Sequence, residues 1–593
     1  MADHTSPMDM PEILLYVAAF LAQQDLVTCT SVSRQWYQAF TPCLWKKFQV
    51  SDDTFLRPTP DILCKHAPQI RNLTLRTVTD LDPFLERLTN LQTLIIIGGA
   101  QFAKPESWLK LTALLQRNPR IDWITLGMNR KIGPPASFLR AIPASCPNLR
   151  RYESSLCLYE DPDQIDALLG IFSRAKEVWT RYESFAVSPT VRTYHFPNLV
   201  ELALKDPRGL STSRQVDIIC MCPNLQYLKW AVGQDTPIPV QEFCERVPQA
   251  CPKLKHFYMD GSATLPRESV GYVLDALKDL ESLMLFGCAI GESLFRSVTR
   301  HFLSLTSLDV MDSFQTKSSM AQRILENCPN LTNVSLALLC MQDVVNGRPW
   351  QATRLQHLQV DLVSLEGACR MAAGGNKDSR MIPWQQIRVF EQLAKLTDLR
   401  HLAIGHLKPI RRPSLEFRVE HGLTLLKSLT RLRHLSLEGT VQDMTEEDAD
   451  WLGQNLRNLD TVEGRLCSTV AEHEALRRRL LKEYRVEVLE RDYEMEELSI
   501  PSGRSGQDPA LEELYGGKDE EEEYSDDDYE YVTEEQIEFE QATEPGVLGY
   551  QDAYEYAVQE GEDYQEVLQS GEHQEFYPHP EPEIIEDNAT RQS

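Results

Sequence analysis

Residues 222–230 read CPNLQYLKW, and the same pattern returns as CPKLKHFYM at residues 251–259 and as CPNLTNVSL at residues 328–336. In each copy a Cys-Pro pair is followed by apolar residues in the order apolar-x-x-apolar-x-apolar. Proline ends a preceding helix and favours an extended chain just before it. Each copy therefore predicts the end of a helix followed by a short strand, and the cysteine is expected to be a small buried residue.

The pattern recurs fifteen times, in full or in degenerate form, from Ile70 to beyond Leu459. Most copies start 24–30 residues after the previous one, which is close to the period of leucine-rich repeats. We therefore predict an α/β fold, a leucine-rich-repeat solenoid (horseshoe) over residues 51–470, with an inserted loop near 370–383. The first apolar positions of the copies are Ile70, Leu91, Ile121, Leu149, Ala175, Leu199, Leu225, Leu254, Leu280, Leu305, Leu331, Leu355, Leu399, Leu432 and Leu459.

The first fifty residues carry a second signal, which reads MPEILLYVAAFLAQQDLVTCTSVSRQWYQAFTPCLWKKF from Met10 to Phe48. Apolar residues recur there at helical spacing, which predicts three short helices over residues 1–50. The segment resembles an F-box, the helical motif by which substrate receptors of SCF-type ubiquitin ligases bind the Skp adaptor. The resemblance implies adaptor contacts by Pro11, Ile13, Leu14, Leu21, Leu26, Val32, Trp36, Leu44 and Trp45.

The F-box and the repeats together resemble F-box leucine-rich-repeat proteins, of the fungal type in the short F-box and irregular repeats. The resemblance implies a non-catalytic receptor without a cofactor, which binds the Skp adaptor and through it the cullin scaffold. The solenoid would bind a protein substrate, whose identity the sequence leaves open, for ubiquitin-dependent degradation. We expect neither nucleic acid nor a membrane as a partner.

The repeat register predicts which side chains face outward from the strands. Successive residues of a strand point to opposite sides, so the residues that flank the buried apolar positions lie on the concave face. Aromatic residues and arginine, which often dominate protein interfaces, are frequent among them. The predicted substrate-binding residues are Trp123, Trp179, Arg181, Tyr227, Lys229, His256, Tyr258 and Phe286.

Histidine occupies one repeat position four times, at His256, His357, His401 and His434. A metal-binding or pH-sensing row is one interpretation, and a polar residue typical of the repeat is the one we favour. The sequence contains no C-x-x-C pair, P-loop, G-x-G-x-x-G or G-x-S-x-G motif, and His473-Glu474 lacks the second histidine of H-E-x-x-H. We therefore expect no metal site and no enzyme activity.

Charge divides the chain near residue 500. Of its 88 acidic and 60 basic residues, 29 and 3 lie from Pro501 onward, which leaves 59 and 57 in the first 500. We predict a charged capping helix at 471–498 and an acidic disordered tail at 499–593. Ser525, which Asp526 follows, resembles a site for an acidic-directed kinase. The tail keeps open an alternative function, a leucine-rich-repeat scaffold or chaperone for basic proteins without a link to ubiquitin.

The sequence shows neither a signal peptide nor a membrane span, so we expect the protein in the cytoplasm, the nucleus or both. The apolar run from Leu14 to Ala22 follows Asp3, Asp9 and Glu12, whereas a signal peptide has positive charge at that place. No other apolar run approaches the roughly 20 residues that cross a bilayer.

Overall fold

The structure is a computed structural model, which describes residues 10–490 except 51–58, 77–81, 99, 129–132, 187–193, 233–238, 262–266, 312, 314–315, 364–382, 406–414 and 441. The predicted tail with Ser525 lies outside the described residues, as does the predicted inserted loop apart from Pro383. None of the described helices is both long and apolar enough to cross a membrane.

Three helices form the predicted F-box segment: α1 (Pro11–Ala18), α2 (Gln23–Thr30) and α3 (Arg34–Leu44). Pro11 occupies the first turn of α1, where a backbone N–H has no helical partner and its loss is tolerated. Ser33 caps α3, because its Oγ accepts a hydrogen bond from the backbone N–H of Trp36 at 3.1 Å. Leu14, Ala18, Leu26 and Phe40 form a small core of their own between the three helices.

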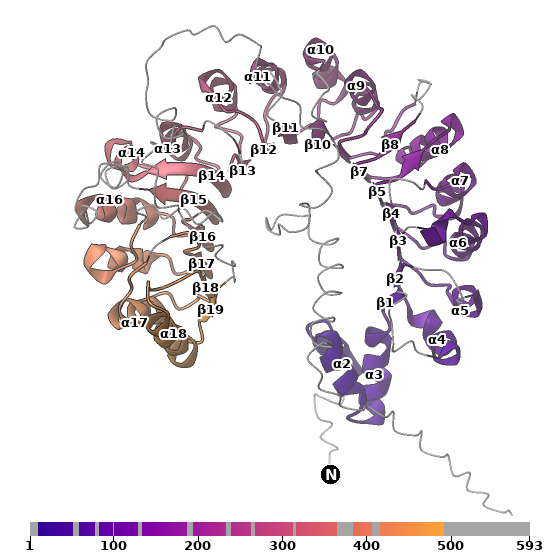
Figure 1. Ribbon diagram of the computed structural model, residues 1–593, viewed down its shortest axis with the longest axis horizontal. Coiled ribbons are helices and arrows are strands. Elements are labelled where there is room, and N and C mark those ends of the chain that lie inside the picture. The colour runs from indigo at the N-terminus through magenta and orange to yellow at the C-terminus, as the bar shows by residue number, and fades with distance from the viewer. Residues whose placement is uncertain are drawn as a thin grey trace, which may run out of the picture. The chain divides into compact units, whose positions relative to one another are not determined.

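One parallel sheet then runs through the chain (Figure 1). Its strands pair in chain order, each with the next, as a solenoid requires. A separate two-stranded sheet pairs β6 (Leu158–Tyr159) with β8 (Ser184–Phe185). The strands of the large sheet are β1 (Lys47–Val50), β2 (Asn72–Leu75), β3 (Thr93–Gly98), β4 (Trp123–Met128), β5 (Arg151–Ser155), β7 (Glu177–Arg181), β9 (Glu201–Lys205), β10 (Tyr227–Val232), β11 (His256–Gly261), β12 (Ser282–Phe286), β13 (Ser307–Asp309), β14 (Asn333–Cys340), β15 (His357–Val363), β16 (His401–Ala403), β17 (His434–Ser436), β18 (Thr461–Glu463) and β19 (Glu487–Leu489).

The predicted repeat register is the pairing register of the sheet. The middle apolar residue of each repeat pairs with the middle apolar residue of the next, for example Leu228 with Phe257 and Leu402 with Leu435. The degenerate repeat at Tyr152 keeps this register, because Tyr152 pairs with Ile124 on one side and Val178 on the other. The predicted α/β solenoid fold is therefore confirmed.

Helices cover one side of the large sheet, as Figure 1 shows from β2 to β18. The strand leucines and the inner faces of these helices form one continuous buried core. Between β16 and β17 the 3-10 helices η4 (Val419–His421) and η5 (Leu423–Ser428) cover the sheet. The α-helices are α4 (Pro60–His66), α5 (Asp82–Arg87), α6 (Pro105–Arg117), α7 (Ala136–Ser145), α8 (Pro162–Phe172), α9 (Thr212–Cys220), α10 (Val240–Ala250), α11 (Arg267–Ala276), α12 (Glu292–Thr299), α13 (Ser318–Asn327), α14 (Met341–Asn346), α16 (Pro383–Leu393), α17 (Glu446–Asn455) and α18 (Val470–Arg479).

The cysteines of the Cys-Pro lead-ins are buried free thiols. Cys146, Cys251 and Cys328 each follow the last residue of a helix, where the chain turns into the next strand. Burial raises the pKa of Cys146 and of Cys251 to about 12. These thiols are therefore protonated packing groups, which agrees with the structural role predicted for them.

The predicted helix over residues 471–498 is wrong over residues 485–490. After α18, a π-helical turn (Leu480–Tyr484) ends at Arg485, whose φ of 62° is left-handed. Beyond it β19 pairs in parallel with β18 and buries Val488, so the segment adds one more repeat to the array. Residues 491–498 lie outside the described part of the chain.

Candidate protein-binding surfaces

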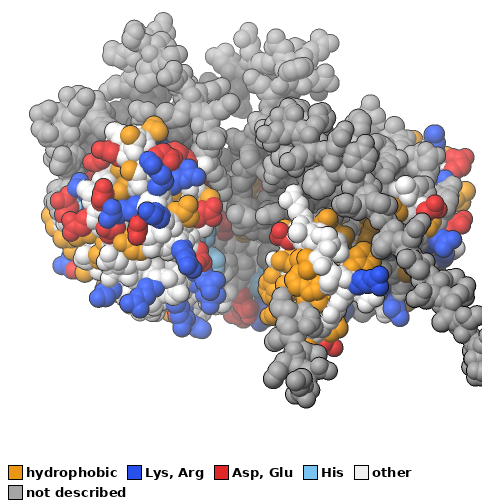
Figure 2. Space-filling model, turned by 90° about the horizontal axis from the view of Figure 1, so that it is seen from below, with side chains coloured by type: hydrophobic (Ala, Val, Ile, Leu, Met, Phe, Trp, Pro, Cys, Tyr) orange, Lys and Arg blue, Asp and Glu red, His pale blue; other side chains and the backbone are white. Residues whose placement is uncertain are grey.

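The F-box helices expose an apolar surface. Tyr16 and Phe20 are 70% and 71% exposed, and their rings contact each other with centroids 5.2 Å apart. Hydrophobic side chains gather over these helices in Figure 2, whereas the end of the solenoid at α17 and α18 shows mixed charge. The other exposed large apolar side chains of the F-box are Met10, Leu15, Val27, Val32 and Tyr37.

The predicted adaptor-binding residues divide into three groups by burial. Pro11 and Val32 are exposed, and Ile13, Leu21, Trp36 and Leu44 are half-buried. Leu14 and Leu26 are buried in the F-box core, so they stabilise the fold of the F-box and do not face a partner directly. Trp45 stacks on His66 of α4 with centroids 4.6 Å apart, and it joins the F-box to the first repeat.

Helical spacing identified the apolar residues of the F-box but not their direction, because both faces of α1 are apolar. Tyr16, Phe20 and Val27 are not among the predicted adaptor contacts. The first two are the most exposed large apolar side chains of the F-box.

The side of the large sheet that faces away from the helices, called the strand face below, carries all eight predicted substrate-binding residues. Trp123, Tyr227 and His256 lie at the amino ends of their strands, in one row of paired positions. Trp179, Lys229 and Tyr258 lie two residues further on in a second row, and Arg181 and Phe286 in a third. Trp179 is only 7% exposed, whereas Phe286 is well exposed.

An arginine that was not predicted explains the burial of Trp179. Arg151 of β5 lies between two indole rings, 4.6 Å from the centroid of Trp123 and 4.4 Å from that of Trp179. It also forms an ion pair with Glu153 and lies 3.8 Å from Glu177. A cation held between two aromatic faces and two carboxylates fixes these side chains before any partner binds.

The strand face is divided in charge along its strands. Glu177 and Glu201 are paired residues at the amino ends of β7 and β9. The pKa of Glu201 is raised, first by burial and then by the neighbouring charge of Glu177. At the carboxyl ends of the same strands stand Arg181 and Lys205, which are also paired. On β7 and β9 the strand face therefore presents carboxylates at the amino ends and cations at the carboxyl ends.

Three of the four histidines form a row on adjacent strands. The rings of His357 and His401 are 5.6 Å apart between centroids, and those of His401 and His434 are 4.2 Å apart. His434 contacts Glu463 at 3.2 Å. Burial, and then the other two histidines, lower the pKa of His401 to about 4. His256 lies apart, four strands before His357.

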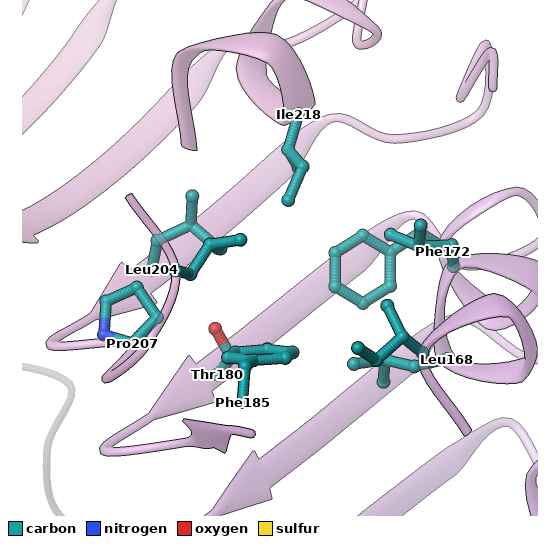
Figure 3. Close-up of a pocket in the computed structure, with 10 residues that line it drawn as sticks. Leu168, Phe172, Thr180, Phe185, Leu204, Pro207 and Ile218 are labelled. Carbon is teal, nitrogen blue, oxygen red and sulfur yellow. The ribbon is translucent and has the colours of Figure 1, made fainter. Parts of the chain in front are cut away.

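The described residues show no candidate metal cluster, and a small apolar cavity lies in the core of the solenoid. They contain no group of three or more histidine, cysteine, aspartate or glutamate side chains placed to hold a metal ion. A cavity of about 20 Å³ lies between α8, β7 and β9, lined by side chains such as Leu168, Phe172 and Leu204 (Figure 3). The hydroxyl of Thr180 donates to the backbone oxygen of Ala203 instead of into this space. An apolar space of this size is a packing gap.

Comparison with known proteins supports the F-box assignment. The family model described as F-box-like matches residues 11–50. No curated protein matches the chain.

Three solved structures resemble the chain at low identity. The TLR13-ssRNA13 complex is 14% identical over 71% of this chain and 65% of that one, with a TM-score of 0.35. The complex of Rad7 and Elc1 in yeast is 14% identical over 63% and 90%, with a TM-score of 0.35. The leucine-rich repeat-containing protein LegL7 from Legionella pneumophila is 15% identical over 55% and 97%, with a TM-score of 0.31.

With TM-scores of 0.35 or less, these three structures support no conclusion about function. The functional proposal below is based on the F-box-like match and on the surfaces described above. The chain therefore combines an F-box-like segment at residues 11–50 with a solenoid of parallel strands and covering helices.

Proposed function

We propose that this protein is the substrate-recognition subunit of an SCF-type ubiquitin ligase. The F-box binds a Skp-type adaptor and through it the cullin scaffold, and the strand face binds a protein substrate in the cytoplasm or the nucleus. The protein itself catalyses no step. It holds the substrate close to a conjugating enzyme, so its contribution to the reaction is proximity.

The observation that carries the proposal is the exposed apolar surface of the F-box. Tyr16 and Phe20 form an aromatic pair that water largely surrounds. Covering a side chain of this size stabilises a complex by roughly 1.5–3 kcal/mol. Contiguous exposed apolar groups of this kind are typical of protein-binding surfaces.

Co-precipitation of the Skp adaptor tests the F-box. We expect Phe20→Ala and Val32→Ala to weaken adaptor binding at least tenfold, because both side chains are exposed and their loss leaves the F-box core intact. Leu303→Ala is the matched control, since Leu303 is 76% exposed on the solenoid. Leu14→Ala and Leu26→Ala are unsuitable, because they remove core side chains. Equal recovery of the adaptor with all variants would refute the proposed contact.

Substrate capture tests the strand face separately. We expect alanine at Trp179, Tyr227 and Tyr258 to abolish capture of the substrate while the adaptor is retained. Trp179→Ala also frees Arg151 from one of its two rings, so its effect should exceed that of Tyr227→Ala alone. Proteins that accumulate around the wild type only when the proteasome is inhibited identify the substrate. Unchanged recovery of those proteins with the triple variant would contradict this role of the face.

The alternative is a scaffold or chaperone for basic proteins, which the excess of 29 acidic over 3 basic residues after Pro501 favours. Absence of the adaptor from the wild-type precipitate, with basic proteins recovered instead, would favour this function.

A further inference from the structure

Three cations lie close together on the strand face, at the carboxyl ends of neighbouring strands. Arg181 of β7 is paired with Lys205 of β9. Lys229 of β10 lies one row nearer the amino end, two residues before Ala231, the partner of Lys205. Adjacent strands are about 4.8 Å apart, so the three charges share one small area.

Carboxylates neutralise this group only in part. Lys205 lies 4.0 Å from Asp260, and nearby Arg208 lies 3.7 Å from Asp206. Among the residues that the structure describes, no carboxylate lies within 4 Å of Arg181 or of Lys229. These two cations contact aromatic rings instead: Arg181 lies 5.3 Å from the centroid of Trp179, and Lys229 lies 4.0 Å from that of Tyr258.

The ionisation of Lys229 reports the local potential. Burial, followed by the positive charges of Lys205 and Arg181, lowers the pKa of Lys229 to about 8, and Asp260 opposes this only in part. Burial and the neighbouring cations disfavour the charged form of this ammonium group, and an anion bound beside it would favour that form.

The backbone turn at the ends of these strands recurs in the array, since Leu156 directly after β5 is left-handed too, with φ of 57°. Tyr182 and Asp206 directly follow Arg181 and Lys205, and both are left-handed, with φ of 54° and 45°. A non-glycine residue in this region costs on the order of 1 kcal/mol. The turn at Tyr182 brings its ring over Lys205, with the ammonium 5.2 Å from the ring centroid.

We propose that Arg181, Lys205 and Lys229 form a subsite that binds one anionic side chain of the substrate, a carboxylate or a phosphate. Arginine and lysine donate charge-assisted hydrogen bonds to such groups, and the rings of Trp179 and Tyr258 bound the site. The opposite ends of β7 and β9 carry Glu177 and Glu201 instead of cations, and Glu177 there is paired with Arg150 and lies 3.8 Å from Arg151. This inference rests on the proposed function and names the chemical class of side chain that the strand face accepts.

Acetylation of lysines in the full-length protein, quantified by mass spectrometry, tests the subsite without an identified substrate. A bound anion raises the pKa of Lys229, and each unit of increase slows its acetylation about tenfold near neutral pH. We expect tetraglutamate or a phosphoserine tetrapeptide to slow the modification of Lys229 at least fivefold. Exposed Lys278 serves as the internal control and should be unaffected. Arg181→Met should reduce the protection.

The two peptides distinguish a carboxylate from a phosphate, and protection by either supports the subsite. Unchanged acetylation of Lys229, protection by inorganic phosphate but neither peptide, or equal protection of Lys278 would overturn it. Because the wild type alone gives the decisive reading, a variant that fails to fold does not affect the result. Failure of adaptor binding would refute the proposed function and leave this measurement intact.

Discussion

Glu183 is a fully buried acid in the loop between β7 and β8, and it provides the sharpest test of the structure. Burial raises its pKa from 4.5 to about 8, and Ser154 with the backbone of Cys157 and of Arg181 lowers it only in part. The carboxyl group is therefore protonated in the folded protein at neutral pH. Substitution by glutamine keeps its shape and removes its ionisation.

The expected effect follows from linkage between protonation and folding. The native pKa lies above the unfolded pKa, so protonation stabilises the native state fully below about pH 4.5, and this contribution is lost as the pH rises toward 8. The loss is about 1.4 kcal/mol for each pH unit. Between pH 5 and pH 8 the wild type should lose roughly 3.5 kcal/mol through this group, and Glu183→Gln should not.

Urea unfolding followed by circular dichroism at pH 5, 6.5 and 8 measures this difference. We expect Glu183→Gln to match the wild type within about 1 kcal/mol at pH 5 and to be clearly more stable at pH 8. Glu160→Gln, which changes an exposed residue of a nearby segment, is the control and should follow the wild type at every pH. If Glu183→Gln is destabilised at pH 8, the carboxyl is ionised and paired in the native state, and the reasoning is wrong.

Two further predictions concern stability. His401 is neutral in the folded protein because its pKa is lowered from 6.5 to about 4, so the contribution of this one group to stability should fall as the pH drops below 6.5, by about 2 kcal/mol at pH 5. The difference in unfolding free energy between His401→Gln and the wild type should therefore shift by this amount in favour of the variant between pH 7.5 and pH 5, and an unchanged difference would contradict it; exposed His195→Gln is the control. Leu308→Ala should cost 2–5 kcal/mol because Leu308 is buried in the strand core, whereas Leu303→Ala should cost less than about 0.5 kcal/mol. Equal urea midpoints for these two variants would refute the assigned register.

The sequence predicts the solenoid well because one local signal repeats, so that an error at one copy is corrected by the others. Even the weak repeat at Tyr152 takes its place by pairing with stronger neighbours. The two end strands, β1 and β19, were missed. Val488 of β19 and Val486 just before the strand lie in a strongly charged segment that also suits a helix, and pairing with the edge of β18 decides the outcome. Pairing between strands that are distant in the sequence cannot be predicted from the residues of the segment alone.

For the strand face, the sequence predicted the side of the sheet on which each side chain lies, but not the contacts between those side chains. Alternation along a strand placed Trp123 and Trp179 on the correct side, because it depends only on register. The contacts of both rings depend on Arg151, which belongs to a degenerate repeat and lies between them. In the F-box, likewise, the spacing of apolar residues did not separate the core residue Leu14 from exposed Phe20.

The join between the F-box and the solenoid is itself structured. Strand β1 follows α3 after two residues and pairs along its full length with β2. Trp45 stacks on His66, and Phe48 packs against Phe84 with centroids 5.6 Å apart. Under the proposed function this structured join holds the strand face at a fixed distance from the adaptor. A substrate lysine would be modified for its distance from the docked segment more than for the sequence around it, and a change in the length or stiffness of this join would change which lysines are modified.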